Sequence, residues 1–243
     1  MGRVSKLTAQ EGETEAELAP TGPSNGQLVR RLTSDLAAER IRRMIFDGTL
    51  RTGERVDLDH ISAELGVSRL PVREAVRSLA QDGLLVFEPH AMPYVAEFDA
   101  EVLRDQFEII GMVEGLAVGR VAVSKDPEVL ARLGDLAQQI QSEEDPQLVR
   151  ELGWEFQRTI NRAGASTRQK AVLRSLRRMV PSGLWRDVPG SADAERAGSE
   201  LVWHAIMTGN RDAASQARAE IVRQRGEIII ALLRKRGVFV SDG

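Results

Sequence analysis

The first hundred residues contain three consecutive segments in which apolar side chains recur every three or four positions. This spacing places the apolar residues on one face of a helix, so the sequence predicts three short amphipathic helices. The apolar positions are Leu36, Ile41, Met44 and Ile45 in the first segment, Leu58, Ile61 and Leu65 in the second, and Val72, Val76 (or Ala75) and Leu79 in the third. Gly48, Gly66 and Gly83 follow the three segments, where glycine often ends a helix.

A tight turn at residues 66–68 joins the second predicted helix to the third. Ser68 is predicted to cap the third helix, because its side-chain oxygen can accept a free backbone N–H. Pro71 falls in the first turn, where its missing N–H costs little. Two short apolar runs, 84–87 and 94–96, flank the turn residues 88–93 and predict a small β-hairpin. This region therefore reads as a helix-turn-helix followed by a wing.

Beyond Asp99 only helical patterns follow, separated by proline and glycine. They span 100–124, 127–141, 145–164, 168–181, 192–209 and 211–236. The predicted fold class is mainly α, with an N-terminal winged helix-turn-helix that carries a small β-hairpin and a C-terminal all-α helical bundle. The expected division is a flexible tail at 1–28, the winged helix-turn-helix domain at 29–97, the helical domain at 98–236 and a tail at 237–243.

Arginine recurs at every fourth residue of the third predicted helix, opposite its apolar face. Arg69, Arg73 and Arg77 therefore share one face that begins at the helix start. Arginine binds phosphate and makes paired contacts with guanine, so the pattern predicts a helix inserted into the major groove of DNA. The predicted DNA contacts are Ser68, Arg69, Leu70, Arg73, Arg77, Arg43 and His90. The alternative is three solvated arginines on an ordinary helix, which the capped turn and the hairpin make the weaker interpretation.

Charge and composition limit how this contact can work. The net charge is −3, and residues 29–96 hold ten arginines against ten acidic residues, so no overall basic field attracts nucleic acid. We expect a modest, strongly salt-dependent affinity for non-specific DNA. The chain has no cysteine, no apolar run of about 18 residues and no apolar core of a secretory signal. These features predict a cytoplasmic protein without disulfides or contact with a membrane.

Residues 33–96 resemble the winged helix-turn-helix of GntR-type bacterial transcriptional regulators. The resemblance rests on Leu36-Ala-Ala-Glu-Arg-Ile-Arg-Arg-Met-Ile-Phe-Asp-Gly48 and on Gly66-Val-Ser-Arg-Leu-Pro-Val-Arg-Glu-Ala-Val-Arg-Ser-Leu-Ala-Gln-Asp-Gly-Leu84. The helical remainder, as far as residue 236, resembles the FadR-type (FCD) domain, which binds effectors and dimerises. The resemblance implies a homodimer on a palindromic operator in double-stranded DNA, and a small molecule in the helical domain that alters the affinity for DNA. We expect a repressor that its ligand releases.

This sequence departs from the family pattern in the DNA-binding part. Asp59 stands where many members carry an arginine that contacts DNA, and its negative charge would repel phosphate. We therefore expect that contact to be lost. The wing reads His90-Ala-Met-Pro93 where many members carry glycine, which weakens the expectation that it enters the minor groove.

The helical part departs further. Many FCD domains hold a divalent metal with one aspartate and three histidines, whereas the corresponding positions here are Gly153, Gln157, Ser199 and Ile221, or Gln224 with a shifted helix. An arginine common on the first helix of the domain is replaced by Ile110. Because these residues cannot replace an imidazole–carboxylate set, we expect no metal, no other cofactor and a less polar pocket. The predicted lining is Ile110, Phe156, Gln157, Ser199, Trp203 and Ile221.

An apolar or amphipathic effector, such as a fatty-acyl, steroid-like or aromatic compound, would suit that pocket. One alternative is that the aromatic residues Trp154, Phe156 and Trp203 only fill the core, and that the helical domain only dimerises. An enzyme is disfavoured, because the chain has no cysteine, His204 has no partner motif, and no Gly-rich phosphate loop is present. The acidic run 143–145 lies just before Pro146 and reads as a solvated loop.

Overall fold

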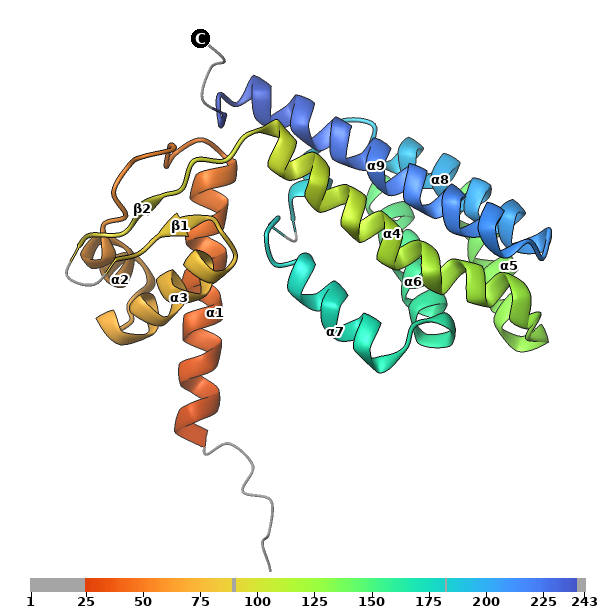
Figure 1. The fold of residues 1–243 in the computed structure, drawn as a ribbon, viewed down its shortest axis with the longest axis horizontal. Helices are drawn as coiled ribbons and strands as arrows, with labels where there is room; N and C mark the ends of the chain where they lie inside the picture. The colour runs from red at the N-terminus through yellow and green to blue at the C-terminus, as the bar shows by residue number, and fades with distance from the viewer. Residues whose placement is uncertain (1–24, 89–90, 182, 240–243) are drawn as a thin grey trace, which may run out of the picture.

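The structure is a computed structural model that describes residues 25–88, 91–181 and 183–239 of the chain. A small N-terminal part lies beside an elongated bundle of helices (Figure 1). The N-terminal part consists of α1 (Asn25–Phe46), α2 (Leu58–Leu65), α3 (Arg69–Gln81), β1 (Leu85–Val86) and β2 (Tyr94–Val95). The bundle consists of α4 (Ala100–Ser124), α5 (Pro127–Ser142), α6 (Pro146–Gly164), α7 (Thr167–Leu176), the 3₁₀ helix η1 (Leu184–Asp187), α8 (Ser191–Met207) and α9 (Arg211–Lys235). The predicted fold class is thereby confirmed.

The apolar faces of the three N-terminal helices meet in one core. Most positions that the apolar spacing assigned to the inner face are buried there: Ile41, Met44, Ile45, Ile61, Val72, Val76 and Leu79. Leu36 is an exception, because Ala37, Ala38 and Ile41 take the inward face of α1 and leave it exposed. The hairpin is short and antiparallel, with Leu85 opposite Val95 and Val86 opposite Tyr94.

Close packing of α4 against α9 forms the spine of the bundle. The two helices run antiparallel and side by side (Figure 1). Gly111 and Gly115 on α4 face Ala219 and Ser215 on α9, and a Cβ at either glycine would meet a backbone carbonyl oxygen at 2.9 and 2.6 Å. The absence of side chains at these glycines is therefore what lets the two backbones approach. Of the described helices, none is both long enough and apolar enough to cross a membrane.

Three predicted boundaries differ from the observed ones. Helix α1 begins at Asn25, inside the segment expected to be a tail, and α7 ends at Leu176 instead of continuing to 181. The start of the expected C-terminal tail is packed, because Val238 is buried and the ring of Phe239 lies 5.9 Å from that of Phe98. The rest of both expected tails, 1–24 and 240–243, lies outside the described residues.

Candidate DNA interface and effector pocket

The turn between α2 and α3 is built as the sequence predicts, apart from its cap. Gly66 adopts a left-handed backbone with φ of 64° after the last residue of α2. Asp57 caps the start of α2, since its Oδ1 accepts the backbone N–H of Asp59 and of His60 at 2.9 and 3.0 Å. Ser68 occupies the N-cap position of α3, but the predicted capping bond is absent. Ser68 is therefore exposed at the start of α3 without a capping bond from its hydroxyl.

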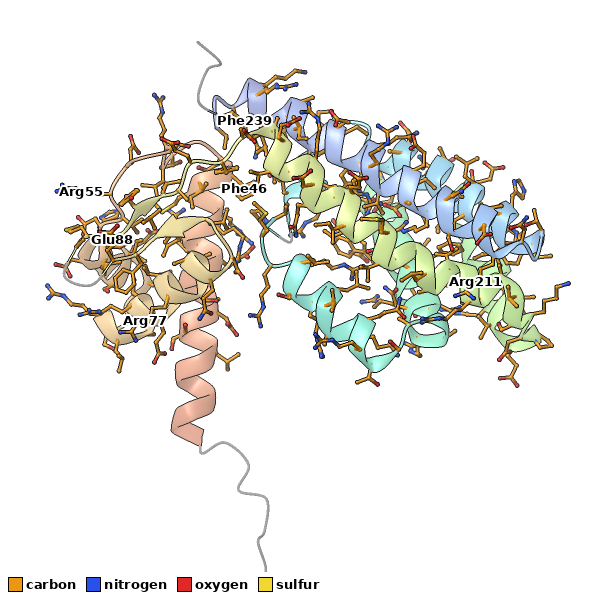
Figure 2. All side chains as sticks on the ribbon, viewed as in Figure 1. Phe46, Arg55, Arg77, Glu88, Arg211 and Phe239 are labelled. Carbon is orange, nitrogen blue, oxygen red and sulfur yellow. The ribbon has the colours of Figure 1, made fainter. Side chains whose placement is uncertain are left out.

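Three arginines on α3 form one wall of an open groove. Arg69, Arg73 and Arg77 are exposed on the outward face of the helix, as the four-residue spacing predicts. Figure 2 shows Arg77 on the side of the N-terminal part that faces away from the bundle. The groove has a volume of about 640 Å³, and the wing supplies its other wall. Its remaining lining residues are Asp57, Leu58, Asp59, Phe87, Ala91, Met92 and Pro93.

The other predicted DNA contacts are distributed differently. Leu70 is half exposed at the tip of α3, next to the arginines. Arg43 does not line the groove; it lines a separate cavity of about 220 Å³ between α1 and the bundle, together with Arg186, Asp187 and Arg236. His90 lies outside the described residues. The groove is therefore lined by Arg69, Arg73 and Arg77, but not by Arg43.

Asp59 holds Arg69 in a bidentate ion pair. Arg69 Nε lies 2.5 Å from Asp59 Oδ1, and Arg69 Nη2 donates to Oδ2 at 2.7 Å. Both side chains are mostly exposed, so the pair is worth about 0–1 kcal/mol. The carboxylate of Asp59 therefore occupies the guanidinium group of the first arginine of α3.

Replacing Asp59 with asparagine is expected to tighten binding to DNA up to about fivefold, because Arg69 no longer has to leave a carboxylate. The affinity for DNA should also fall more steeply with salt concentration, by the amount that one additional phosphate contact contributes. Fluorescence anisotropy with labelled operator at several salt concentrations measures both effects. Asp35→Asn, on the exposed surface of α1, is the charge-matched control. Equal tightening in the two variants would mean that general charge, not the ion pair, sets the affinity.

A second cavity, of about 430 Å³, lies inside the helical bundle among α4, α6, α8, α9, η1 and the residues after α7. Much of its wall is apolar or aromatic: Phe107, Ile110, Trp154, Leu176, Val180, Pro181, Trp185, Val222 and Ile229. The charged lining residues are Glu114, Arg158, Arg177, Glu195, Arg218 and Arg225. The expectation of a less polar pocket stays a prediction: the wall is largely apolar, although charged groups from other positions also line it.

The charged groups form two clusters. Glu114, buried on α4, accepts from Arg218 Nε at 2.7 Å and also pairs with Arg177. Burial raises the pKa of Glu114, but the two guanidinium groups outweigh it and hold the pKa at about 2. In the second cluster, Glu195 Oε2 lies 2.6 Å from Arg225 Nη2, and the Arg225 guanidinium stacks 4.5 Å above the Trp185 ring.

Three polar atoms on the wall of this cavity are buried without a hydrogen-bond partner among the described residues. They are Gln157 Oε1, Trp185 Nε1 and Arg225 Nε. A buried polar group without a partner costs about 1–3 kcal/mol. All three belong to residues that line the cavity, but neighbouring atoms shield each of them from the open space.

The sequence predicted this lining only in part. Ile110 and Gln157 line the cavity, whereas Phe156, Ser199, Trp203 and Ile221 do not. Phe156 and Ile221 are packed in the core of the bundle, and Trp203 lies against Gly134 of α5. The Ser199 hydroxyl donates to the backbone oxygen of Glu195 at 2.5 Å. Trp154, for which a pure core role was the alternative, lines the cavity.

The residues present do not fit the metal that the FCD resemblance implies. A side chain at Gly153 would overlap the carboxylate of Glu195, which fills the space where the family places its aspartate. Gln157, Ser199 and Ile221 offer no imidazole. Within the described ranges, no group of three or more His, Cys, Asp or Glu side chains is arranged to hold a metal ion.

The junction between the two parts links the cavity to the DNA-binding helices. Arg236, just after α9, donates from Nη1 to the backbone oxygen of Phe46 at 3.3 Å, and its Nη2 lies 3.3 Å from Asp187 Oδ2. Asp187 belongs to η1, the same short helix as Trp185. The rings of Phe46 and Phe98 are 5.7 Å apart, and Phe46 and Phe239 lie between the two parts in Figure 2.

Comparison with known proteins matches two successive parts of the chain to families. The family described as bacterial regulatory proteins, gntR family, matches residues 33–91, and the FCD domain matches residues 105–224. An uncharacterised helix-turn-helix-type transcriptional regulator of Mycobacterium tuberculosis is 28% identical over 212 residues, covering 86% of each chain. A probable D-xylose utilisation operon transcriptional repressor of Paenarthrobacter nicotinovorans is 36% identical over 99 residues, which cover 39% of this chain and 43% of that protein.

Solved structures show the same fold. Escherichia coli McbR/YncC superposes with a TM-score of 0.53 at 21% identity, covering 84% of this chain and 98% of that one. Lar, described as controlling expression of the Listeria monocytogenes agr system, superposes with a TM-score of 0.53 at 16% identity over 82% of this chain and 97% of its own. These relatives are transcriptional regulators and not enzymes. With its gntR-type helix-turn-helix followed by an FCD domain, the chain belongs to the GntR family of bacterial transcriptional regulators and has the architecture of the FadR subfamily.

Proposed function

We propose that this regulator is a cytoplasmic repressor that binds a palindromic operator as a homodimer, and that an amphipathic, acidic small molecule in the bundle cavity controls its affinity for DNA. The observation that carries the effector is the cavity of about 430 Å³, whose wall combines apolar side chains with the guanidinium groups of Arg177, Arg218 and Arg225. It favours this reading over a helical domain that only dimerises, because a filled core would leave no space of this size.

The chemistry of the wall supports an acidic group on the effector. Arg158 pairs with Glu155 outside the cavity, which leaves Arg177, Arg218 and Arg225 against Glu114 and Glu195. The balance is one positive charge. A carboxylate or sulfonate matches it, while the apolar wall suits an alkyl or aromatic body. The proposed effector therefore remains amphipathic and needs no metal ion to hold its acid.

Decanoate and 8-anilinonaphthalene-1-sulfonate are suitable probes for this pocket, with decyltrimethylammonium as the oppositely charged comparison. We expect both anions to change tryptophan fluorescence, and Trp185→Phe to weaken their binding about tenfold, because the smaller ring holds the Arg225 guanidinium less firmly against the acid. Trp203→Phe, outside the cavity, is the matched control. Equal affinity for the cationic probe, or an unaffected Trp185→Phe variant, would refute an acid-binding pocket.

The junction supports a route from the pocket to DNA. A ligand that contacts Trp185 acts on η1, whose Asp187 pairs with Arg236, and Arg236 in turn binds the last carbonyl of α1. A ligand shifts the affinity for DNA only if it prefers one arrangement of this junction. By linkage, operator DNA must then change the affinity for the ligand by the same factor. Titrating the probe anions with and without operator measures that factor directly.

The DNA-binding half is tested by replacing Arg73 with alanine. Arg73 lies in the middle of the groove wall between Arg69 and Arg77. Its loss should weaken specific operator binding by about 1–3 kcal/mol, or about 5- to 150-fold, without changing the oligomeric state. Arg132→Ala, on the exposed surface of α5, is the control. A gel-shift competition in which Arg73→Ala binds like wild type would show that α3 is not the recognition helix.

A further inference from the structure

The cavity between α1 and the bundle, here called the junction cavity, carries more positive than negative side chains on its wall. Its volume is about 220 Å³, and its arginines are Arg43 from α1, Arg186 from η1 and Arg236 from the turn after α9. Asp47 and Asp187 also line it, which leaves the wall with an excess of one positive charge. Three separate segments of the chain therefore each bring a guanidinium group to one small space.

The Arg186 guanidinium has no counter-ion among the residues that the structure describes. The side chain is exposed, and none of the ion pairs at the junction includes it. It lies over the backbone of Gly183, where a Cβ would be 3.1 Å from Arg186 Nη2. Because both residues line the junction cavity, the donors of this arginine are placed beside the cavity and remain open to an acceptor.

The other two arginines are bound only through long contacts. Arg43, which the sequence predicted to contact DNA, is 57% exposed, and its Nε lies 3.4 Å from Glu39 Oε1. Arg236 lies 3.3 Å both from Asp187 Oδ2 and from the backbone oxygen of Phe46. Charge-assisted hydrogen bonds between nitrogen and oxygen are usually about 2.7–2.9 Å long, and a guanidinium has five donors. Both arginines can therefore bind a further anion without losing a strong pair.

The arrangement of the three arginines suits a phosphate group. Guanidinium groups form paired hydrogen bonds with phosphate and with carboxylate. A carboxylate offers two oxygens in one plane, whereas the oxygens of a phosphate point in several directions and can meet donors that come from three segments. Phe46, Pro181 and Leu184 supply the apolar part of the wall. The small volume leaves room for a compact body beside the phosphate, but not for a long chain.

We propose that the junction cavity binds a small phosphate, either inorganic phosphate or the phosphate group of a small metabolite, and that this ligand bridges α1 and the bundle. The site is distinct from the bundle cavity, because η1 contributes Trp185 to that cavity and Leu184, Arg186 and Asp187 to this one, with only Pro181 shared. It shares no lining residue with the groove along α3. The proposal therefore depends neither on the acidic effector nor on binding to DNA.

Calorimetric titration of the full-length protein with sodium phosphate, at constant ionic strength, tests the ligand class. We expect one saturable site with a dissociation constant below about 1 mM. Sodium acetate is the carboxylate comparison and should bind at least tenfold more weakly. Glucose 6-phosphate, titrated in parallel, distinguishes the two sources: tighter binding than inorganic phosphate assigns the site to a phosphate ester, and weaker binding assigns it to the free ion. Acetate that binds as tightly as phosphate, or no binding of either phosphate, would overturn the proposal.

Two substitutions test whether the ligand spans the junction. Arg43→Gln on α1 and Arg186→Gln on η1 should each weaken phosphate binding at least about tenfold, because each removes a charge-assisted hydrogen bond from one side of the cavity. Both side chains are exposed, so the circular dichroism spectrum should not change. Arg168→Gln, exposed on α7 and outside the cavity lining, is the charge-matched control. Unchanged binding in either cavity variant, or equal weakening in all three, would show that phosphate is not held between the two parts.

Discussion

Replacing Glu114 with glutamine is expected to lower the free energy of unfolding by about 3–5 kcal/mol, the largest effect of any single substitution considered. The carboxylate is buried between Arg218, also buried, and the half-exposed Arg177. An amide keeps the volume but removes the charge, and so leaves the Arg218 guanidinium in the interior without its counter-ion. Urea denaturation at pH 7, followed by circular dichroism, measures the change.

Glu101→Gln is the matched control for this experiment. Glu101 lies on the same helix, is 82% exposed and pairs with Arg104 one turn away. Its replacement should cost less than about 1 kcal/mol, because exposed ion pairs contribute little. If the two variants lost similar stability, burial of the Glu114 charge would not be the cause.

The same residue makes stability depend on acid pH. The pKa of Glu114 is about 2 in the folded protein, below its ordinary value of 4.5, so the folded state holds this proton less tightly than the unfolded state. The contribution is fully present above pH 4.5 and is lost as the pH falls towards 2. It amounts to about 3 kcal/mol on the scale of 1.36 kcal/mol per pKa unit. The stability gap between wild type and Glu114→Gln should therefore narrow over this range.

A cluster of charges built around a buried carboxylate is a poor means of stabilising a core. Replacing such groups together by well-packed apolar residues is often neutral or stabilising, even though removing one partner is costly. The cluster of Glu114, Arg177 and Arg218 is therefore better explained by its place on the cavity wall than by stability. This argument favours a polar ligand in the cavity.

The helix-turn-helix could be predicted from the sequence because its determinants are local. The left-handed Gly66 and the four-residue spacing of the α3 arginines depend only on neighbours along the chain. The ion pair between Asp59 and Arg69 was not predicted, since it joins residues of two helices. The sequence did contain a sign of this ion pair, because Asp59 stands where the family resemblance implies an arginine.

The cavity lining was harder to predict, because it depends on how four helices rotate against each other. Predicted Ser199 lies one turn after Glu195, and predicted Ile221 lies one turn before Arg225, so both choices had the right helix and the wrong position. Phe156 precedes Gln157 and points about 100° away from it. Charged residues on the buried faces of two helices were a stronger signal for the cavity lining. They are Glu114 on α4 and Arg218 and Arg225 on α9, which all face the interior of the bundle.

The close packing of α4 against α9, which builds part of the cavity wall, can be tested by substituting Gly115. A Cβ there would lie 2.6 Å from the backbone oxygen of Ser215 on α9, well inside van der Waals contact, and a backbone atom cannot rotate away as a side chain can. The helices must separate, which also pulls Glu114 away from Arg218. Gly115→Ala should therefore lower the free energy of unfolding by about 2–3 kcal/mol, although alanine favours a helix over glycine by about 1 kcal/mol.

Gly134→Ala provides the comparison that isolates this clash. Gly134 lies inside α5, and its nearest neighbour across the interface is the Trp203 ring at 3.2 Å, a side chain that can shift. The gain in helix propensity and the tighter contact should nearly cancel, so that the unfolding free energy stays within about 1 kcal/mol of wild type. Parallel urea titrations of the two variants decide between the explanations. Should Gly115→Ala prove as stable as Gly134→Ala, close approach of α4 and α9 would not be what holds the pocket wall in place.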